Sequence, residues 1–137
     1  MSRLKKLHEN LSRVKVLYVE DEDDVRAETL LFLGRLFDDV SSAVNGEDGL
    51  GMFMKNSYDL VVTDLKMPKM DGHDMLSKIH ALNKETVLIV MTASDSNMDV
   101  TQTQCDAYLY KPVMMMDFVE ALESLEDKII YSSRSKQ

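Results

Sequence analysis

Residues 20–24 are five acids in a row, and they directly follow an apolar segment that ends at Val19. Carboxylates placed this densely repel one another unless positive charge compensates them. A divalent cation such as Mg²⁺ takes oxygen ligands, commonly one or two carboxylates together with water or phosphate oxygens. A metal shared by Glu20 and Asp21 therefore accounts for the first two acids. The other three suit the amino terminus of a helix, where negative charge is favourable.

Three more polar residues stand at the ends of apolar segments, namely Asp64, Thr92 and Lys111. An aspartate carboxylate can attack phosphorus and form an aspartyl phosphate. In such a reaction a metal ion and a lysine neutralise the phosphoryl oxygens, and a hydroxyl group can donate a hydrogen bond to them. Asp64 is the candidate nucleophile, because its segment falls between the one that carries the acid pair and those that carry Thr92 and Lys111.

These residues meet only if the apolar segments are parallel strands, and the pattern of the chain predicts that they are. The predicted strands cover 14–19, 39–44, 58–65, 86–93 and 106–111, and the predicted helices cover 24–37, 47–57, 72–82 and 114–130. Alternating strands and helices imply right-handed crossovers and a parallel sheet that is covered on both faces. Ligands bind such sheets beyond the carboxyl ends of the strands. We therefore predict an α/β fold, a doubly wound five-stranded parallel sheet in a single domain.

The composition is that of one globular domain. The chain has 137 residues, enough for a single buried core, and a net charge of −8, which argues against nucleic-acid binding through a general positive field. Its single cysteine, Cys105, leaves no internal disulfide and fits a reducing cytosol. No apolar run reaches membrane-spanning length. We expect a cytoplasmic domain that binds neither nucleic acid nor membrane directly.

Two terminal segments flank the predicted domain, which we place at 14–130. Residues 1–13 carry three leucines at helical spacing, so they form either a short amphipathic helix or a loosely attached lead-in. Residues 131–137 are polar, and they are either a C-terminal tail or the start of a truncated linker.

Four segments resemble the signatures of the receiver domain of two-component response regulators. They are VLYVEDE at 16–22, VVTDLKMPKMDG at 61–72, VLIVMTA at 87–93 and DAYLYKP at 106–112. The spacings agree as well, since Asp64 comes 43 positions after Asp21 and 28 before Thr92, as is usual in the family. The resemblance covers residues 14 to 130. It implies a flavodoxin-like, CheY-like fold with strand order 2-1-3-4-5.

The resemblance implies a signalling switch rather than an enzyme with an external substrate. Asp64 would accept a phosphoryl group from a sensor histidine kinase or a histidine phosphotransfer protein. The domain would catalyse only its own phosphorylation and dephosphorylation, with Mg²⁺ as its cofactor. Asp21 would bind the metal directly and Glu20 through water, and the backbone carbonyl of Lys66 would be another ligand.

Three further roles follow from the same resemblance. Thr92 and Lys111 would contact the phosphoryl oxygens, and the Lys111–Pro112 peptide bond would be cis. Tyr108 would be the aromatic residue whose rotamer follows the state of the site, although packing in the core suits it equally well. The signal would pass to an output partner or to an effector domain that follows the chain.

The region before the last strand departs from the family pattern. Lys111 comes 19 positions after Thr92, about three fewer than usual, and Gln104 stands where glycine is typical. Residues 94–104 are rich in Ser, Asp, Asn and Thr, which favour caps and turns over helix interiors. We expect a short or irregular helix there, the most mobile part of the domain, in a region that belongs to the family's output surface.

The predicted helix at 24–37 is more apolar than one buried face requires. A core stripe at helical spacing is joined by Leu30, Leu31 and Leu33, which lie partly off it. This excess suits the docking of a kinase or phosphotransfer helix. A wider buried face, or packing against the N-terminal segment, explains it equally well.

Other functions fit the sequence less well. A haloacid-dehalogenase-like phosphatase needs a second acid two residues after its nucleophile, where this chain has Lys66. A flavodoxin needs a phosphate-binding loop rich in glycine and hydroxyl groups after the first strand, and the acids at 20–24 would repel the phosphate. A degenerate receiver that serves only as an interaction module is disfavoured because all five key positions are filled.

Overall fold

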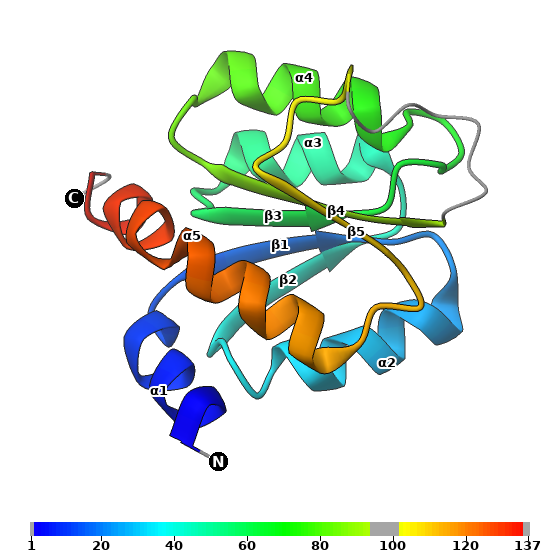
Figure 1. Cartoon of the computed structure of the whole chain (residues 1–137). Coiled ribbons are helices and arrows are strands. Elements are labelled where there is room, and N and C mark those ends of the chain that lie inside the picture. Colours follow the sequence, from blue (N-terminus) through cyan, green and yellow to red (C-terminus); the bar gives the residue numbers. More distant parts are fainter. Residues whose placement is uncertain (1, 94–101, 136–137) are drawn as a thin grey trace.

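Five parallel strands form the centre of the computed structural model, which describes residues 2–93 and 102–135 (Figure 1). They are β1 (Lys15–Val19), β2 (Asp39–Ala43), β3 (Leu60–Thr63), β4 (Val87–Ala93) and β5 (Ala107–Lys111). Their order in the sheet is β2-β1-β3-β4-β5. The predicted doubly wound sheet and its strand order are confirmed.

Helices cover both faces of this sheet. They are α1 (Ser2–Leu11), α2 (Asp23–Leu33), α3 (Gly46–Lys55), α4 (Gly72–Leu82) and α5 (Met115–Ser135). In Figure 1, α3 and α4 lie on one face, while α2 and α5 lie on the other face with α1 at its edge. None of the described helices is long and apolar enough to cross a membrane.

The central strands are apolar on both sides because each side faces a helical layer. Along β1, Val16 and Tyr18 belong to the core beneath α2 and α5, whereas Leu17 and Val19 belong to the core beneath α3 and α4. β3 is buried along its whole length. This double burial explains why strands 1, 3 and 4 are nearly continuous apolar runs in the sequence.

The strand register brings the predicted site residues to one edge of the sheet. Val19 of β1 lies opposite Thr63 of β3, so the next residues, Glu20 and Asp64, leave the sheet side by side. On the other side of β3, Ala93 of β4 pairs with Lys111 of β5. The carboxyl ends of β1, β3, β4 and β5 therefore converge, as the strand pattern predicts.

The N-terminal segment forms a helix that is part of the core. Leu7 and Leu11 of α1 are buried in the same apolar cluster as Leu122 and Ile129 of α5. At the surface, Arg3 forms an ion pair with Glu123 of α5 at 2.6 Å. Of the two alternatives for this segment, the amphipathic helix is the one that the structure contains.

The last helix is longer than the sequence pattern predicts. We expected it to end at residue 130, but α5 continues to Ser135, so residues 131–135 are helical. Ser132 is buried in this added part. The irregular helix predicted at 94–104 falls mostly outside the described residues, so that expectation stays a prediction.

Candidate functional site

Three carboxylates meet where β1 and β3 end. Oxygen atoms of Glu20, Asp21 and Asp64 lie within 4.8 Å of one another. Glu20 is almost fully buried, with 1% of its side chain exposed, and Asp64 is 12% exposed. Oxygen ligands at this spacing suit a hard divalent cation such as Mg²⁺. The three acids that the sequence assigns to a metal are thus brought together.

Lys111 supplies positive charge to the same cluster. Its Nζ donates hydrogen bonds of 2.8 Å to Oε1 of Glu20 and 2.8 Å to Oδ2 of Asp64. Part of the crowded negative charge is therefore neutralised from within the chain, by a residue at the end of β5. The sequence predicted the convergence of Lys111 and Asp64 but not the pairing of Lys111 with Glu20.

Burial and charge act in opposite directions on this pair. Burial raises the pKa of the Glu20 carboxyl above its usual value, although the hydrogen bond and charge of Lys111 oppose that shift. For Lys111, burial acts to lower the pKa, but the hydrogen bonds to Asp64 and Glu20 outweigh it and raise the pKa above its usual value. The ammonium form of Lys111 is therefore held firmly at neutral pH.

Backbone contacts fix the position of Asp64. Its own amide donates to the carbonyl of Val19 at 3.2 Å, and its Oδ1 accepts a hydrogen bond from the amide of Leu65 at 2.7 Å. The amide of Gly72, the first residue of α4, donates to the carbonyl of Leu65 at 2.7 Å. The loop after β3 is thus tied both to β1 and to the start of α4.

Gly72 allows this close approach because it has no side chain. A Cβ atom on Gly72 would lie 2.1 Å from the carbonyl oxygen of Asp64 and 2.8 Å from Cα of Leu65. Sequence reasoning did not single out Gly72, although it closes the segment VVTDLKMPKMDG that carries Asp64. A glycine at a fixed distance after a candidate nucleophile was the available signal.

A second glycine holds the other end of this loop. The amide of Gly46, at the start of α3, donates to the carbonyl of Met70 at 3.1 Å, and a Cβ there would lie 2.1 Å from the same oxygen. Within the loop, Lys69 has a φ of 67°, in the left-handed region that a lysine rarely adopts. The loop beside the site is therefore closely packed and locally strained.

Thr92 brings a buried hydroxyl to the end of β4. Its side chain is 1% exposed, and among the described residues its Oγ1 has no hydrogen-bond partner. A buried hydroxyl without a partner costs about 1–3 kcal/mol, so such a group is uncommon without a reason. An oxygen-rich group bound near Asp64 would supply the missing acceptor.

The remaining predicted site residues lie in the loop after β3 and along β5. Lys66 is exposed and lies two residues after Asp64, and the role of its backbone carbonyl as a metal ligand stays a prediction. The Lys111–Pro112 bond is cis, as expected. Tyr108 is 42% exposed and packs edge-to-face on Tyr110 with a ring separation of 5.9 Å, so it is not a core residue. Its role as a switch stays a prediction.

Comparison with known proteins identifies the family. The family model described as the response regulator receiver domain matches residues 16–123. The chain therefore belongs to the receiver domains of two-component response regulators. The matched region includes all of the site residues named above, and it leaves out α1 and the end of α5.

Relatives and solved structures agree with this assignment. The chain is 28% identical over 114 residues to the regulatory protein VanRB of Enterococcus faecalis, a match that covers 82% of this chain and 52% of that one. A CheY-like receiver domain from Methanospirillum hungatei superposes with a TM-score of 0.76 at 26% identity, covering 90% and 99% of the two chains. TrrA from Thermotoga maritima, solved in complex with Mg²⁺–BeF, gives 0.70 at 28% identity, covering 82% and 98%. The chain spans about half the length of the curated relatives that it matches.

Proposed function

We propose that this receiver domain is a Mg²⁺-dependent phosphoacceptor switch that is phosphorylated on Asp64. The observation that carries the proposal is the position of the Asp64 carboxylate, which contacts Lys111 and lies within metal-sharing distance of Glu20 and Asp21. This combination offers a nucleophile, a cation for the phosphoryl oxygens and a place for a second cation. The solved TrrA complex, with Mg²⁺ and a beryllium fluoride group, supports the same chemistry in a relative.

Asp21, Glu20 and Asp64 would hold the metal, together with the carbonyl of Lys66. Bound there, Mg²⁺ offsets the negative charge of the phosphoryl oxygens. The buried acids fit this role because Lys111 alone leaves more negative than positive charge in the cluster. Asp21 has the more open position of the acid pair, which suits direct ligation, and the buried Glu20 suits a contact through water.

In the proposed reaction an oxygen of Asp64 attacks the phosphorus of a phosphohistidine on a sensor kinase or phosphotransfer protein. The new P–O bond forms as the P–N bond breaks, and the imidazole leaves with its electron pair and takes up a proton. Lys111 already contacts Oδ2 of Asp64, and it would then form an ion pair with an oxygen of the transferred phosphoryl group. The unpartnered Oγ1 of Thr92 would donate to one of them. Attack by water on the same phosphorus would return the domain to its first state and release phosphate.

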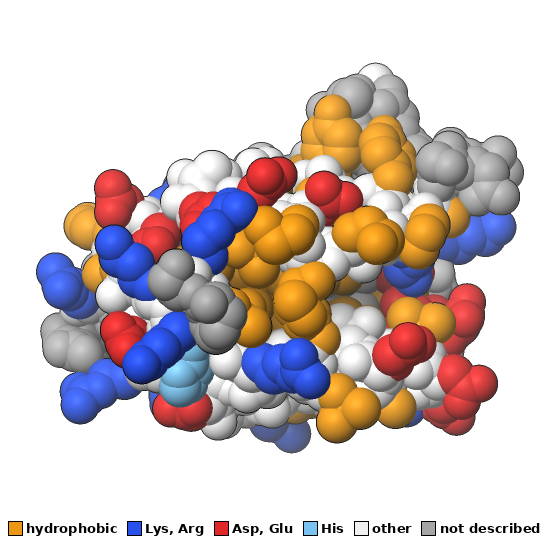
Figure 2. All heavy atoms as spheres, turned by 60° about the horizontal axis from the view of Figure 1, so that its bottom comes forward, with side chains coloured by type: hydrophobic (Ala, Val, Ile, Leu, Met, Phe, Trp, Pro, Cys, Tyr) orange, Lys and Arg blue, Asp and Glu red, His pale blue; other side chains and the backbone are white. Residues whose placement is uncertain are grey.

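The donor protein would dock on the face formed by α2 and the start of α5. Of the three leucines that lie off the core stripe of α2, Leu33 is buried and Leu30 packs against the core, so both belong to a wider buried face. Leu31 remains 78% exposed. Figure 2 shows hydrophobic side chains gathered across the middle of this side of the molecule. The methionines at 114–116, where α5 begins, are exposed as well.

The output of the switch would reach a separate partner or an effector domain. The curated relatives are about twice the length of this chain, and one of them is described as a transcriptional regulatory protein. An effector domain would therefore be the source of any nucleic-acid binding, because this domain carries a net charge of −8. Lys66 stands two residues after Asp64, where a haloacid-dehalogenase-like phosphatase needs a second acid, and this continues to argue against a phosphatase that acts on external substrates.

Intact-protein mass spectrometry tests the proposal. Acetyl phosphate with Mg²⁺ should add one phosphoryl group to the native chain, and chelation of the metal should prevent it. Asp64→Asn should remove the modification, whereas Asp127→Asn, which changes an exposed acid on α5, should retain it. Modification that persists in Asp64→Asn, or steady hydrolysis of p-nitrophenyl phosphate by the native chain, would contradict the proposed function.

A further inference from the structure

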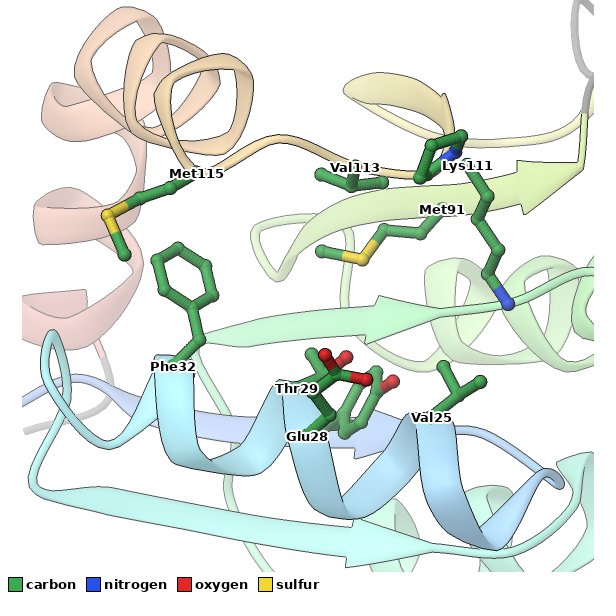
Figure 3. Close-up of a pocket in the computed structure, with 10 residues that line it drawn as sticks. Val25, Glu28, Thr29, Phe32, Met91, Lys111, Val113 and Met115 are labelled. Atoms are coloured by element: carbon green, nitrogen blue, oxygen red, sulfur yellow. The ribbon is translucent and has the colours of Figure 1, made fainter.

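A pocket of about 610 Å³ lies between α2 and the segment that joins β5 to α5. Figure 3 shows Val25, Thr29 and Phe32 of α2 on one wall, with Met91, Val113 and Met115 facing them from the other side. The volume is within the range of pockets that hold small ligands, and the lining is mostly apolar with few polar groups. Because Lys111 forms one end of the pocket, the space lies directly beside the phosphoacceptor site.

Lys111, the cation in the wall, is already bound by carboxylates of the protein. The ammonium of Lys111 donates to Glu20 and Asp64. The Tyr18 hydroxyl carries no charge at ordinary pH, because burial raises its pKa to about 12. A ligand therefore gains little from replacing these contacts, and an anion would have to compete with two carboxylates for Lys111.

Glu28 is the exception. It lines the pocket from α2 as an exposed residue, and among the described residues it forms no hydrogen bond or ion pair. Arg26, the cation on the same helix, is committed to Asp23 at 2.7 Å and to the carbonyl of Glu20 at 2.9 Å. An uncompensated negative charge thus stands beside an apolar cavity. Attraction to a cation there is favoured further by the net charge of −8.

We propose that this pocket is a binding site for a small organic cation, an amine with an apolar aromatic or alkyl body. The body would fill the space between Phe32 and Met91, where burial of apolar surface drives binding. The amine would pair with Glu28 at the mouth. The proposal concerns binding alone and does not depend on phosphorylation, although a ligand in this place would touch Lys111, which positions Asp64.

A titration with 2-phenylethylamine, followed by amide and methyl NMR of the full chain, tests the site. We expect saturable shifts at Val25, Phe32, Met91 and Val113. The neutral analogue 2-phenylethanol and the anionic analogue 3-phenylpropionate have similar bodies, and both should bind more weakly than the amine. Glu28→Gln should lower the affinity for the amine about two- to five-fold, which is the usual contribution of an exposed ion pair, and should leave the affinity for the alcohol unchanged.

Glu47→Gln is the matched control. It removes the same charge from α3, on the opposite face of the sheet, and should bind the amine like the native chain. The proposal is overturned if no shifts appear at these residues, if the alcohol or the acid binds as tightly as the amine, or if Glu28→Gln has no effect. Shifts of the same amides on dilution without any amine would show that a second copy of the chain fills the pocket, and would also overturn it.

Discussion

The contact between Gly72 and the backbone of Asp64 predicts a large effect from a single methyl group. In Gly72→Ala the new Cβ would lie 2.1 Å from the carbonyl oxygen of Asp64, 2.8 Å from Cα of Leu65 and 3.0 Å from the carbonyl carbon of Asp64. All three atoms belong to the backbone, so no side-chain rotation relieves the clash. The loop that carries the candidate nucleophile must move by about 1 Å to restore ordinary packing.

Two magnitudes follow from this displacement. Overpacking of a close contact costs about 1–3 kcal/mol, and the gain in helix propensity from alanine is at most about 1 kcal/mol, so the free energy of unfolding should fall by roughly 1–2 kcal/mol. A misplacement of about 1 Å at a reacting group can slow a reaction about 100-fold. We therefore expect phosphorylation by acetyl phosphate to slow by one to two orders of magnitude.

Urea unfolding and the initial rate of phosphorylation measure the two effects. Gly51→Ala is the control, because Gly51 lies inside α3 and a Cβ there would meet nothing within 4 Å. It should stabilise the protein by about 0.5–1 kcal/mol and leave the rate unchanged. If Gly72→Ala matches Gly51→Ala in both stability and rate, the reasoning about how Asp64 is positioned is refuted.

Three other substitutions test separate parts of the structure. Leu11→Ala should lower the free energy of unfolding by about 2–5 kcal/mol, because Leu11 of α1 is fully buried. The control Lys5→Ala, at an exposed position of the same helix, should change it by less than about 0.5 kcal/mol, and equal effects would contradict the packing of α1 into the core. Asp21→Ala should weaken Mg²⁺ binding in a calorimetric titration while sparing or raising metal-free stability, and an unchanged affinity would contradict its role as a ligand. Lys69→Gly should raise the free energy of unfolding by about 1 kcal/mol because the φ of 67° is strained for lysine; a loss of stability would show that its side chain matters more than its backbone.

The sheet, and the edge of it where the site lies, could be predicted from the same sequence pattern. Each central strand is an apolar run that ends on a polar residue, as at Asp64 and Thr92. In a parallel sheet buried on both faces, such runs are distinct from the amphipathic helices between them. Strand order followed from the family resemblance, and the carboxyl ends of parallel strands necessarily share one edge.

Helix ends were predicted less well because apolar spacing continues past the point where a helix stops. We expected the helix predicted at 24–37 to reach residue 37, but α2 ends at Leu33, and Gly34 follows as its C-cap. Leu36 and Phe37 are nevertheless buried, in turns rather than in helix. The opposite error occurred at α5, which continues through the polar residues 131–135, where Ser132 is buried.

Details of the site depended on geometry that residue types do not specify. The sequence identified Lys111 and Glu20 as site residues, but only the direction of the two side chains decides that they pair. The need for glycine at position 72 likewise arises from how closely α4 approaches the Asp64 backbone. Spacing along a chain indicates which residues share an edge, and three-dimensional packing decides which atoms touch.

The most direct test of the account is to locate the phosphorylated residue chemically. Borohydride reduces an aspartyl phosphate to homoserine, so treatment of the phosphorylated chain followed by peptide sequencing in a mass spectrometer marks the acceptor. The account predicts homoserine at position 64, and only when Mg²⁺ and the phosphodonor were both present. Homoserine at another acid of the cluster, such as Asp21, or a phosphorylated chain that yields no homoserine at all, would contradict it.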